Sequence, residues 1–404
     1  MKTTYLFLCL LGIGSVSGAG QTKQPQKIGD FIESTSYNEH RRNATRSLQY
    51  TPDGDDFVCI NGKNRFTRAL YGSHTAFRLE TSDRPVFAAY TKENPKHICF
   101  KLQTSGGTVA LDSTEHCESR YTAGRRSYSL SDPAFGGGSL SITTWALPDK
   151  EGAIWQFNAR NFKEFHPVLL ASISEIRNSK LNRNGDMGAD PADSFEAPLQ
   201  PQQLQSFPVQ IDGTLYILLE NQELRTLTTA EGENLFKKAE AARSETASRI
   251  RIETPDPYFN TLGGTLAMAA DGIWDGEVWL HGAIGWRMPL SGWRAAYTGD
   301  VLGWHDRART HFNAYAASQV TEVPNTLPHP AQDSALHLAR SVKKWGTPQY
   351  SNGYICRNPH RNNQMHHYDM NLCYIDELLW HFKWTGDLDY VRQMWPVITR
   401  HLTW

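Results

Sequence analysis

The segment Leu140-Ser-Ile-Thr-Thr-Trp-Ala-Leu147 decides the fold class of the first half of the chain. It is short, rich in apolar and β-branched residues, and follows the turn sequence Gly136-Gly-Gly-Ser139. Similar short apolar segments, broken by Gly, Pro, Asn and Asp, recur from Asp55 to Ile217. Such alternation with turn residues is typical of an antiparallel β-sandwich. We therefore predict an N-terminal β-sandwich domain over residues 51–222.

Within this domain, residues 181–203 are too polar and too rich in Gly, Pro and Asp to be core, and we predict a long surface loop. Asn182, Asn184, Asp186 and Asp190 supply oxygen atoms of the kind that bind calcium. Their spacing matches no EF-hand loop, which favours a solvated loop. No cofactor and no metal ligand is predicted, and calcium stays open as the one alternative.

After the sandwich the composition becomes helical. Residues 229–249 are dominated by Ala, Glu, Lys and Arg, with Leu235, Ala239 and Ala242 on one side. Thr254-Pro-Asp-Pro257 then marks the entry to another domain. We assign residues 223–256 to a connecting helix and linker.

Beyond the linker, apolar residues recur at three- and four-residue spacing, which predicts helices over residues 262–280, 306–317, 332–345, 371–384 and 387–404. Gly386 is suited to end one helix and Asp387 to cap the next. Paired antiparallel helices joined by long loops predict an (α/α)6-type helical toroid over residues 257–404. Because the last residues have the pattern of a helix interior, we expect this toroid to be truncated at the C-terminus.

Composition and the N-terminus bear on location and partners. The 404 residues include 41 basic and 42 acidic side chains, and a net charge of −1 argues against a general nucleic-acid binder. Residues 1–20 combine Lys2, an apolar run and a small-residue end, which is typical of a signal peptide. No later stretch is apolar enough to span a membrane. We expect an exported protein, periplasmic or secreted, with residues 21–50 as an N-terminal segment.

The residues best suited to chemistry gather between Asp271 and Arg307. Gly-Trp occurs three times in this stretch, each time followed by Arg or His. Trp faces stack on sugar rings, and Arg pairs with carboxylates through two parallel hydrogen bonds. The predicted substrate-binding residues are Trp286, Arg287, Trp293, Arg294, Trp304, His281 and Asn371. The alternative is that these Trp are core and that the Arg residues form structural bridges with Asp271, Asp275, Asp300 and Asp306.

A second polar group precedes the predicted helix at 371–384. It comprises His366, His367, Tyr368, Asp369 and Asn371, which would lie at the N-terminal mouth of that helix. One of Asp369 and Asn371 is alternatively a helix cap. The two adjacent His lack the spacing of a zinc site.

Two mechanisms fit these residues. Glycoside hydrolysis needs a carboxylic acid and a second carboxylate. β-Elimination at a uronide needs a cation to neutralise the substrate carboxylate and a base to remove the C5 proton. Arg287 and Arg294 fit the first role in elimination, and His281 joins the candidate bases. The predicted catalytic residues for the two routes are Tyr297, Tyr368, His305, His367, Asp275, Glu277 and Asp369. The abundance of Arg and Tyr favours elimination.

The chain also resembles a known class over most of residues 50–404. The segments that carry the resemblance are Arg68-Ala-Leu-Tyr-Gly72, Leu280-His-Gly-Ala-Ile-Gly-Trp-Arg-Met288, Gly292-Trp-Arg-Ala-Ala-Tyr297, Gly303-Trp-His-Asp-Arg307 and Trp384-Thr-Gly-Asp387. Together with the domain order, they resemble a group of unknown function within the six-hairpin glycosidase-like carbohydrate enzymes of gut Bacteroidetes. The chain is also similar to lyases that remove terminal rhamnose from glucuronate on plant arabinogalactan proteins. This resemblance implies an α/α barrel and a tyrosine base.

The sequence thus predicts an exported carbohydrate-active enzyme that cleaves a glycosidic linkage in a uronate-containing glycan, with β-elimination favoured. One alternative is a glycoside hydrolase that uses a carboxylate pair. The other is a glycan-binding protein without catalysis. The expected partner is the glycan, and the oligomeric state is left open.

Overall fold

The computed structural model describes residues 50–63, 68–91, 95–162, 166–176, 204–282, 287–292, 295–321, 332–333, 338–339, 353–360 and 368–403. All of them belong to one unit that spans Gln49–Trp404. The predicted signal peptide, nearly all of the N-terminal segment 21–50 and the predicted loop at 181–203 lie outside the described residues.

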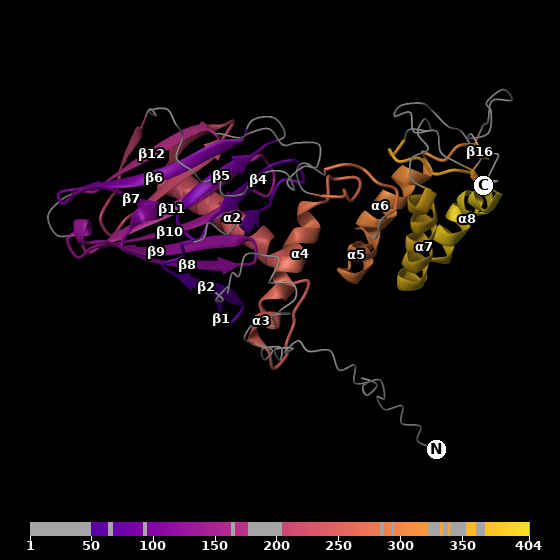
Figure 1. The fold of residues 1–404 in the computed structure, drawn as a ribbon, viewed down its shortest axis with the longest axis horizontal. Helices are drawn as coiled ribbons and strands as arrows, with labels where there is room; N and C mark the ends of the chain where they lie inside the picture. Colours follow the sequence, from indigo (N-terminus) through magenta and orange to yellow (C-terminus); the bar gives the residue numbers. More distant parts are fainter. Residues whose placement is uncertain are drawn as a thin grey trace, which may run out of the picture. The chain divides into compact units, whose positions relative to one another are not determined.

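The first half of this unit consists of two antiparallel sheets (Figure 1). The first sheet has the strand order β1-β2-β8-β9-β10-β11-β14-β15. Its strands are β1 (Thr51–Asp53), β2 (Asp56–Ile60), β8 (His116–Thr122), β9 (Arg125–Ser131), β10 (Ser139–Ala146), β11 (Gly152–Arg160), β14 (Thr214–Glu220) and β15 (Glu223–Leu227).

The second sheet has the order β13-β12-β6-β5-β4-β3, and β7 also pairs with β6. Its strands are β3 (Arg68–Leu70), β4 (Arg78–Thr81), β5 (Val86–Tyr90), β6 (Lys96–Thr104), β7 (Gly107–Ala110), β12 (Val168–Glu175) and β13 (Gln205–Pro208). Short 3-10 turns connect successive strands: η1 (Leu111–Ser113) lies between β7 and β8, and η2 (Pro133–Phe135) lies between β9 and β10.

Aromatic rings hold the two sheets face to face. Phe87 of β5 meets Trp155 of β11 edge to face, with ring centroids 5.4 Å apart. Phe100 of β6 meets Phe157 of β11 with centroids 5.1 Å apart. Alternate residues of each strand contribute to this core, as the burial pattern of β8 shows. The apolar residues that alternate along the sequence therefore lie on the face of each sheet that points toward the other sheet.

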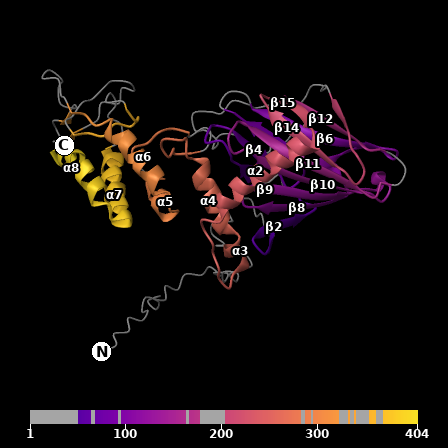
Figure 2. The same cartoon turned by 180° about the vertical axis from the view of Figure 1, so that it is seen from behind.

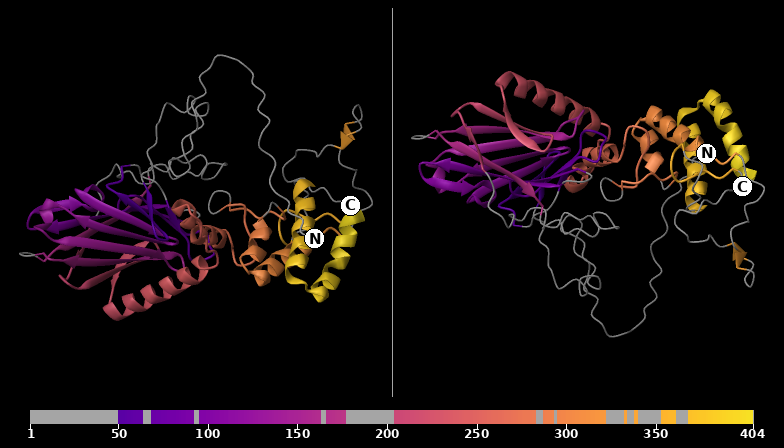
Figure 3. Two further views of the ribbon diagram at one scale, coloured as in Figure 1. Left: turned by 90° about the horizontal axis from the view of Figure 1, so that it is seen from below. Right: turned by 90° about the horizontal axis from the view of Figure 1, so that it is seen from above.

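The helix predicted at 229–249 is confirmed as α2 (Thr229–Ala247). A capping box starts it, because Glu231 N–H donates to the Thr228 hydroxyl (3.3 Å) and Thr228 N–H donates to Glu231 (3.0 Å). Its Phe236 ring lies 4.0 Å from that of Trp145 on β10. The helix therefore covers the outer face of the first sheet, as Figure 2 and both views of Figure 3 show.

The second half of the unit contains α3 (Pro257–Asn260), α4 (Leu262–Gly272), α5 (Ala295–Val301), α6 (His305–Ala316), α7 (Tyr368–Thr385) and α8 (Leu388–Thr403). Rings of Trp279, Phe312 and Tyr374 are central to its core. The predicted turn between the last two helices is confirmed, since Gly386 has φ +63° and the Asp387 carboxylate accepts from Tyr390 N–H (2.9 Å). Within the described ranges, no helix is both long and apolar enough to cross a membrane.

The prediction of an (α/α)6-type toroid is wrong. The helix expected over 262–280 ends at Gly272, and the following residues form turns joined by the bridges Trp274↔Trp279 and Leu280↔Pro289. Part of the helix expected over 332–345 is instead an antiparallel pair, β16 (Gln332–Asp333) and β17 (Leu338–Ala339). The seven-residue α5 is too short for a barrel helix. Gly and Pro break the apolar spacing here, and turns form in place of long hairpins.

Phe87 tests the inter-sheet core. Phe87→Ala removes a fully buried ring that contacts Phe100, Tyr128 and Trp155, so we expect the free energy of unfolding to fall by about 3–5 kcal/mol. Ile60→Ala, at a side chain with 59% exposure, should change it by less than about 0.5 kcal/mol. Denaturant titration of both variants measures the difference, and equal losses would contradict this account of the core.

Candidate functional site

Three loops meet at the end of the helical half where α4 and α6 finish and α7 begins. They comprise residues 273–282, 287–292 and 353–360, and we call them the loop cluster (Figure 1). His281 N–H donates to the Met288 carbonyl (3.0 Å), which joins the first two loops. His360 N–H donates to the Ala314 carbonyl near the end of α6 (3.1 Å), which fixes the third.

The first loop reverses direction at Asp275 and Gly276. The Asp275 carboxylate accepts from the N–H groups of Glu277 (3.0 Å) and Val278 (2.7 Å). Gly276 has φ +99°, a conformation that L side chains rarely adopt. Trp274 and Trp279 pack together across the turn, with ring centroids 4.6 Å apart. Asp275 therefore shapes the turn, and the turn presents Glu277 on the surface.

Glu277 and His360 form a carboxylate–imidazole pair between two of the loops. Glu277 Oε1 lies 2.6 Å from His360 Nε2, and about half of each side chain is exposed. A carboxylate on one ring nitrogen fixes the tautomer and leaves the other nitrogen as a proton acceptor. His360 also has φ +57°, which is strained for a residue with a side chain. The contact orients the imidazole of His360 toward Glu277.

Two half-buried guanidinium groups belong to the same loops. Arg357 Nη2 lies 3.1 Å from Met288 Sδ, and burial lowers the pKa of Arg357. Arg287 Nη2 donates to the His74 carbonyl (2.6 Å), and burial likewise lowers the pKa of Arg287. Among the described residues, no ion pair joins either group to a carboxylate, although the charges of Asp275 and Glu151 act on Arg287. Either guanidinium group could pair with a carboxylate supplied by a ligand in a partly dry setting.

Arg287 is held through a residue of the sheet half. His74, in the β3–β4 loop, has φ +49°, and its Nε2 lies 3.2 Å from Asp271 Oδ1. Arg307 Nη1 donates to the same oxygen (2.7 Å). Burial disfavours the charged form of Asp271, but the hydrogen bonds and charges of His74 and Arg307 outweigh it and lower the pKa of Asp271.

Tyr297 is unsuited to remove a proton. Its hydroxyl donates to the Asp376 carboxylate on α7. Burial, together with the hydrogen bond and negative charge of Asp376, raises the pKa of Tyr297 above its usual value. A tyrosine base needs the opposite environment, in which a nearby cation favours the phenolate.

Trp304 is core and not an exposed plate. It is 6% exposed at the start of α6, and the guanidinium carbons of Arg307 and Arg249 lie 4.3 Å and 5.1 Å from its ring centroid. Because Arg307 also pairs with Asp271, this part of the Trp–Arg motif is satisfied within the chain. Trp304 and Arg307 therefore follow the alternative given in the sequence analysis, in which the Trp is core and the Arg forms a structural bridge.

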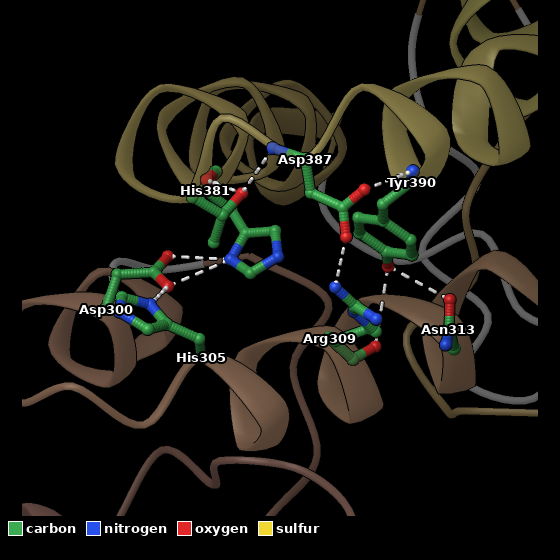
Figure 4. Close-up of polar contacts among 8 residues, drawn as sticks. Asp300, His305, Arg309, Asn313, His381, Asp387 and Tyr390 are labelled. Carbon is green, nitrogen blue, oxygen red and sulfur yellow. Dashed lines mark hydrogen bonds and ion pairs between the residues drawn. The ribbon is translucent and has the colours of Figure 1, made fainter.

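His305 belongs to a network that joins helices (Figure 4). Asp300 Oδ1 accepts from Nδ1 of His305 (2.8 Å) and of the fully buried His381 (2.9 Å). Close by, Arg309 pairs with Asp387 (2.5 Å). The network ties α5 to α6, α7 and α8. His305 is the first residue of α6, whereas the backbone of His360 is bonded to Ala314 near the end of that helix. The two imidazoles therefore lie at opposite ends of α6.

The remaining predicted residues lie around the start of α7 or outside the described residues. Asn371 is buried and donates to the Ile355 carbonyl (2.5 Å), Asp369 is exposed in the first turn, and His281 is exposed in the loop cluster. Trp286, Trp293, Arg294 and His367 lie outside the described residues, as does the side chain of Tyr368. In the described ranges, no three His, Cys, Asp or Glu side chains are arranged to hold a metal.

Sequence reasoning selected the C-terminal part of the polar stretch 357–371 and missed Arg357 and His360. Both stand in the same stretch as the selected residues, immediately before them. Their partners Met288 and Glu277 are about seventy to eighty positions away, so no local spacing marks them. The available signal was the density of basic and polar residues beside Pro359, which indicates a loop.

A family model described as domain of unknown function (DUF4450) matches residues 95–249. This stretch runs from β6 to β15 and includes α2, so it lies in the sheet half and the helix that covers it. No curated protein matches the chain.

Asp300 should matter more for stability than His305. Asp300→Ala leaves the buried Nδ1 donor of His381 without an acceptor, so we expect the free energy of unfolding to fall by about 1–3 kcal/mol. His305→Ala removes a half-exposed partner and should cost less than about 1 kcal/mol. Denaturant titrations compare the two, and a larger loss in His305→Ala would contradict the structural role of Asp300.

Because the pKa of Asp271 is lowered in the folded protein, the free energy of unfolding should fall as the pH becomes acidic. Its pKa in the folded protein is lowered from an unfolded value of about 3.9, so its contribution is complete above that pH. This contribution is lost as the pH falls through the folded pKa. Wild type should therefore exceed Asp271→Asn in melting temperature at neutral pH, and the gap should shrink below about pH 3.9. Asp389→Asn, at an exposed carboxylate, is the control and should show no such gap.

Proposed function

We propose that this protein is an exported carbohydrate-active enzyme that cleaves a uronate-containing glycan by β-elimination, with the loop cluster as its active site. The observation that carries the proposal is the 2.6 Å contact between Glu277 and His360 in the loop cluster, which also includes Arg357 and Arg287. The resemblance noted in the sequence supports the substrate class. The near-neutral charge of the chain supports a glycan partner over a nucleic acid.

In this reaction the substrate uronate binds through its carboxylate to Arg357 and Arg287. Neutralising that carboxylate makes the C5 proton more acidic. His360 Nδ1 removes the proton, because Glu277 holds the Nε2 proton on the other side of the ring. The electron pair of the C5–H bond forms the C4=C5 double bond, and the C4–O bond breaks. The leaving oxygen takes up a proton from water, and the imidazolium of His360 returns its proton to water, so an unsaturated uronide and a free hydroxyl result.

Hydrolysis by a carboxylate pair is the second route, and the contacts favour it less. One oxygen of Asp275 is engaged by two backbone N–H groups of its turn. Glu277 is engaged by His360. Two carboxylates that are both committed to partners are less suited to act as acid and nucleophile or base. A glycan-binding protein without catalysis would show neither product.

Replacement of His360 tests the proposed base. The full-length protein is incubated with a uronate-containing arabinogalactan, and the ultraviolet absorbance of the unsaturated uronide is followed. His360→Gln should lower kcat by about 10²–10⁴-fold, because it removes the general base. Glu277→Gln should lower it less, since the imidazole remains. Tyr297→Phe is the control and should keep wild-type turnover, because the Tyr297 hydroxyl donates to Asp376 on α7.

The product decides among the alternatives. New reducing ends without the absorbance would replace elimination by hydrolysis. Wild-type turnover in His360→Gln, or a loss confined to Tyr297→Phe, would remove the loop cluster as the active site. Absence of any product would leave glycan binding in place of catalysis.

A further inference from the structure

The outer side of α7 is apolar, although this side of a surface helix is usually polar. Leu372, Leu379, Trp380 and Trp384 lie there, each between 41% and 61% exposed. Their spacing stays close to whole helical turns, so they share one side of the helix. The opposite side carries the buried Tyr374, whose hydroxyl donates to a backbone carbonyl of α6 (2.7 Å). The helix therefore has the composition of one that is covered on both sides.

The neighbouring helix α8 adds a second exposed row. Leu388, Trp395 and Leu402 are between 55% and 74% exposed and recur every seven residues, which is the spacing of a coiled-coil seam. α7 and α8 lie side by side, as Figures 1 and 3 show. The three Trp rings of these rows, each about half exposed, alone leave roughly 300 Å² of apolar surface in water. We call the exposed Trp and Leu residues of both helices the α7–α8 surface.

The size of the α7–α8 surface marks it as an interaction site. The largest apolar patch on a typical monomer covers about 300–600 Å² and is often functional. The Trp rings alone reach the lower end of that range, and the leucines of both helices enlarge the area. A standard protein–protein interface buries about 800 Å² on each partner, with an apolar core inside a polar rim. The α7–α8 surface can supply such a core.

Two opposite charges stand on the same side of α7. Asp376 and Lys383 are both exposed and seven positions apart, which is about two helical turns, so both lie on the side that carries Leu379 and Trp380. Lys383 Nζ lies 4.3 Å from the centroid of the Trp380 ring. Asp376 accepts from the Tyr297 hydroxyl, and a carboxylate has further lone pairs for a cation. The two charges therefore flank the apolar centre of this side.

This order of charges is complementary to itself. A two-fold axis perpendicular to α7, between Leu379 and Trp380, would add a second α7 in the antiparallel direction. Asp376 of each copy would then face Lys383 of the partner subunit, and Leu379 would face Trp380 of the partner subunit. A parallel pair in register would instead place equal charges side by side. The charges thus favour one orientation and one register.

We infer that the α7–α8 surface binds a second copy of this chain, with the two α7 helices antiparallel across a two-fold axis between Leu379 and Trp380. The exposed Trp and Leu side chains form the apolar core of this interface, and the rows on α8 extend it. The two contacts between Asp376 and Lys383 fix the register. The inference goes beyond the proposed function and does not rest on it.

Light scattering after size-exclusion chromatography of the full-length protein measures the mass of the particle. At micromolar concentration, wild type should have twice the 45.6 kDa of the chain. Leu379→Glu should weaken the dimer at least about hundredfold and give the mass of one chain, because symmetry places two charges in the apolar centre. Its circular dichroism spectrum should match wild type, since this side chain is exposed in the monomer. Lys237→Glu, on the exposed face of α2, is the control and should remain a dimer.

Exchanged charges test the register. Asp376→Lys places two cations opposite each other at both contacts, and Lys383→Asp places two carboxylates there. Each variant alone should therefore dimerise about tenfold more weakly than wild type. An equimolar mixture of the two variants should recover the wild-type affinity, because each contact then joins a cation to a carboxylate. A purely structural effect of either substitution within its own chain would not be repaired by mixing.

The outcomes decide the inference without reference to turnover. It is overturned if wild type stays monomeric at every concentration, if it forms larger particles of no fixed size, or if Leu379→Glu remains a dimer. A mixture of the two charge variants that dimerises no better than either alone would also overturn it. Leu379→Glu should keep any lyase activity, whereas His360→Gln should lose it and remain a dimer, so failure of the proposed function and failure of this interface are distinguishable.

Discussion

The hydrogen bond from Arg287 to the His74 carbonyl joins the two halves of the described chain at the place where the proposed chemistry lies. The sheet half brings His74 there because the inter-sheet rings fix β3 and β4 and therefore the loop between them. The helical half brings Arg287 there because the loop after α4 reverses at Asp275 and returns through the bridge Leu280↔Pro289. Asp271 and Arg307 reinforce the same junction. The position of Arg287, the cation proposed to bind the substrate, thus depends on packing in both halves.

Features encoded by adjacent residues could be read from the sequence. The strands follow from alternation and turn residues, α2 from its composition, and the turn at Gly386 and Asp387 from two neighbouring positions. Each of these signals concerns backbone conformation or a hydrogen bond across a few residues. They are therefore independent of how the rest of the chain folds.

Features that depend on distant partners could not be read in this way. Helical spacing at 262–280 suggested one long helix, but Gly272, the Asp275 turn and the paired rings of Trp274 and Trp279 end it early. His305 had the chemistry of a base, yet a buried Asp300 draws it into helix packing. His360 was not predicted as a site residue, because Glu277, the residue that orients its ring, is far away in the sequence. Residue type gives the chemistry available, and tertiary contacts decide which residue performs it.

His74 and His360 share one feature, a left-handed backbone at a residue with a branched ring side chain. Glycine or asparagine adopts this conformation at lower cost. Screening libraries of this protein for heat tolerance alone would therefore enrich such replacements at His360, whereas a replacement at His74 would also lose the contact with Asp271. At His360 such a replacement would relax the backbone and remove the imidazole that is proposed to act as the base.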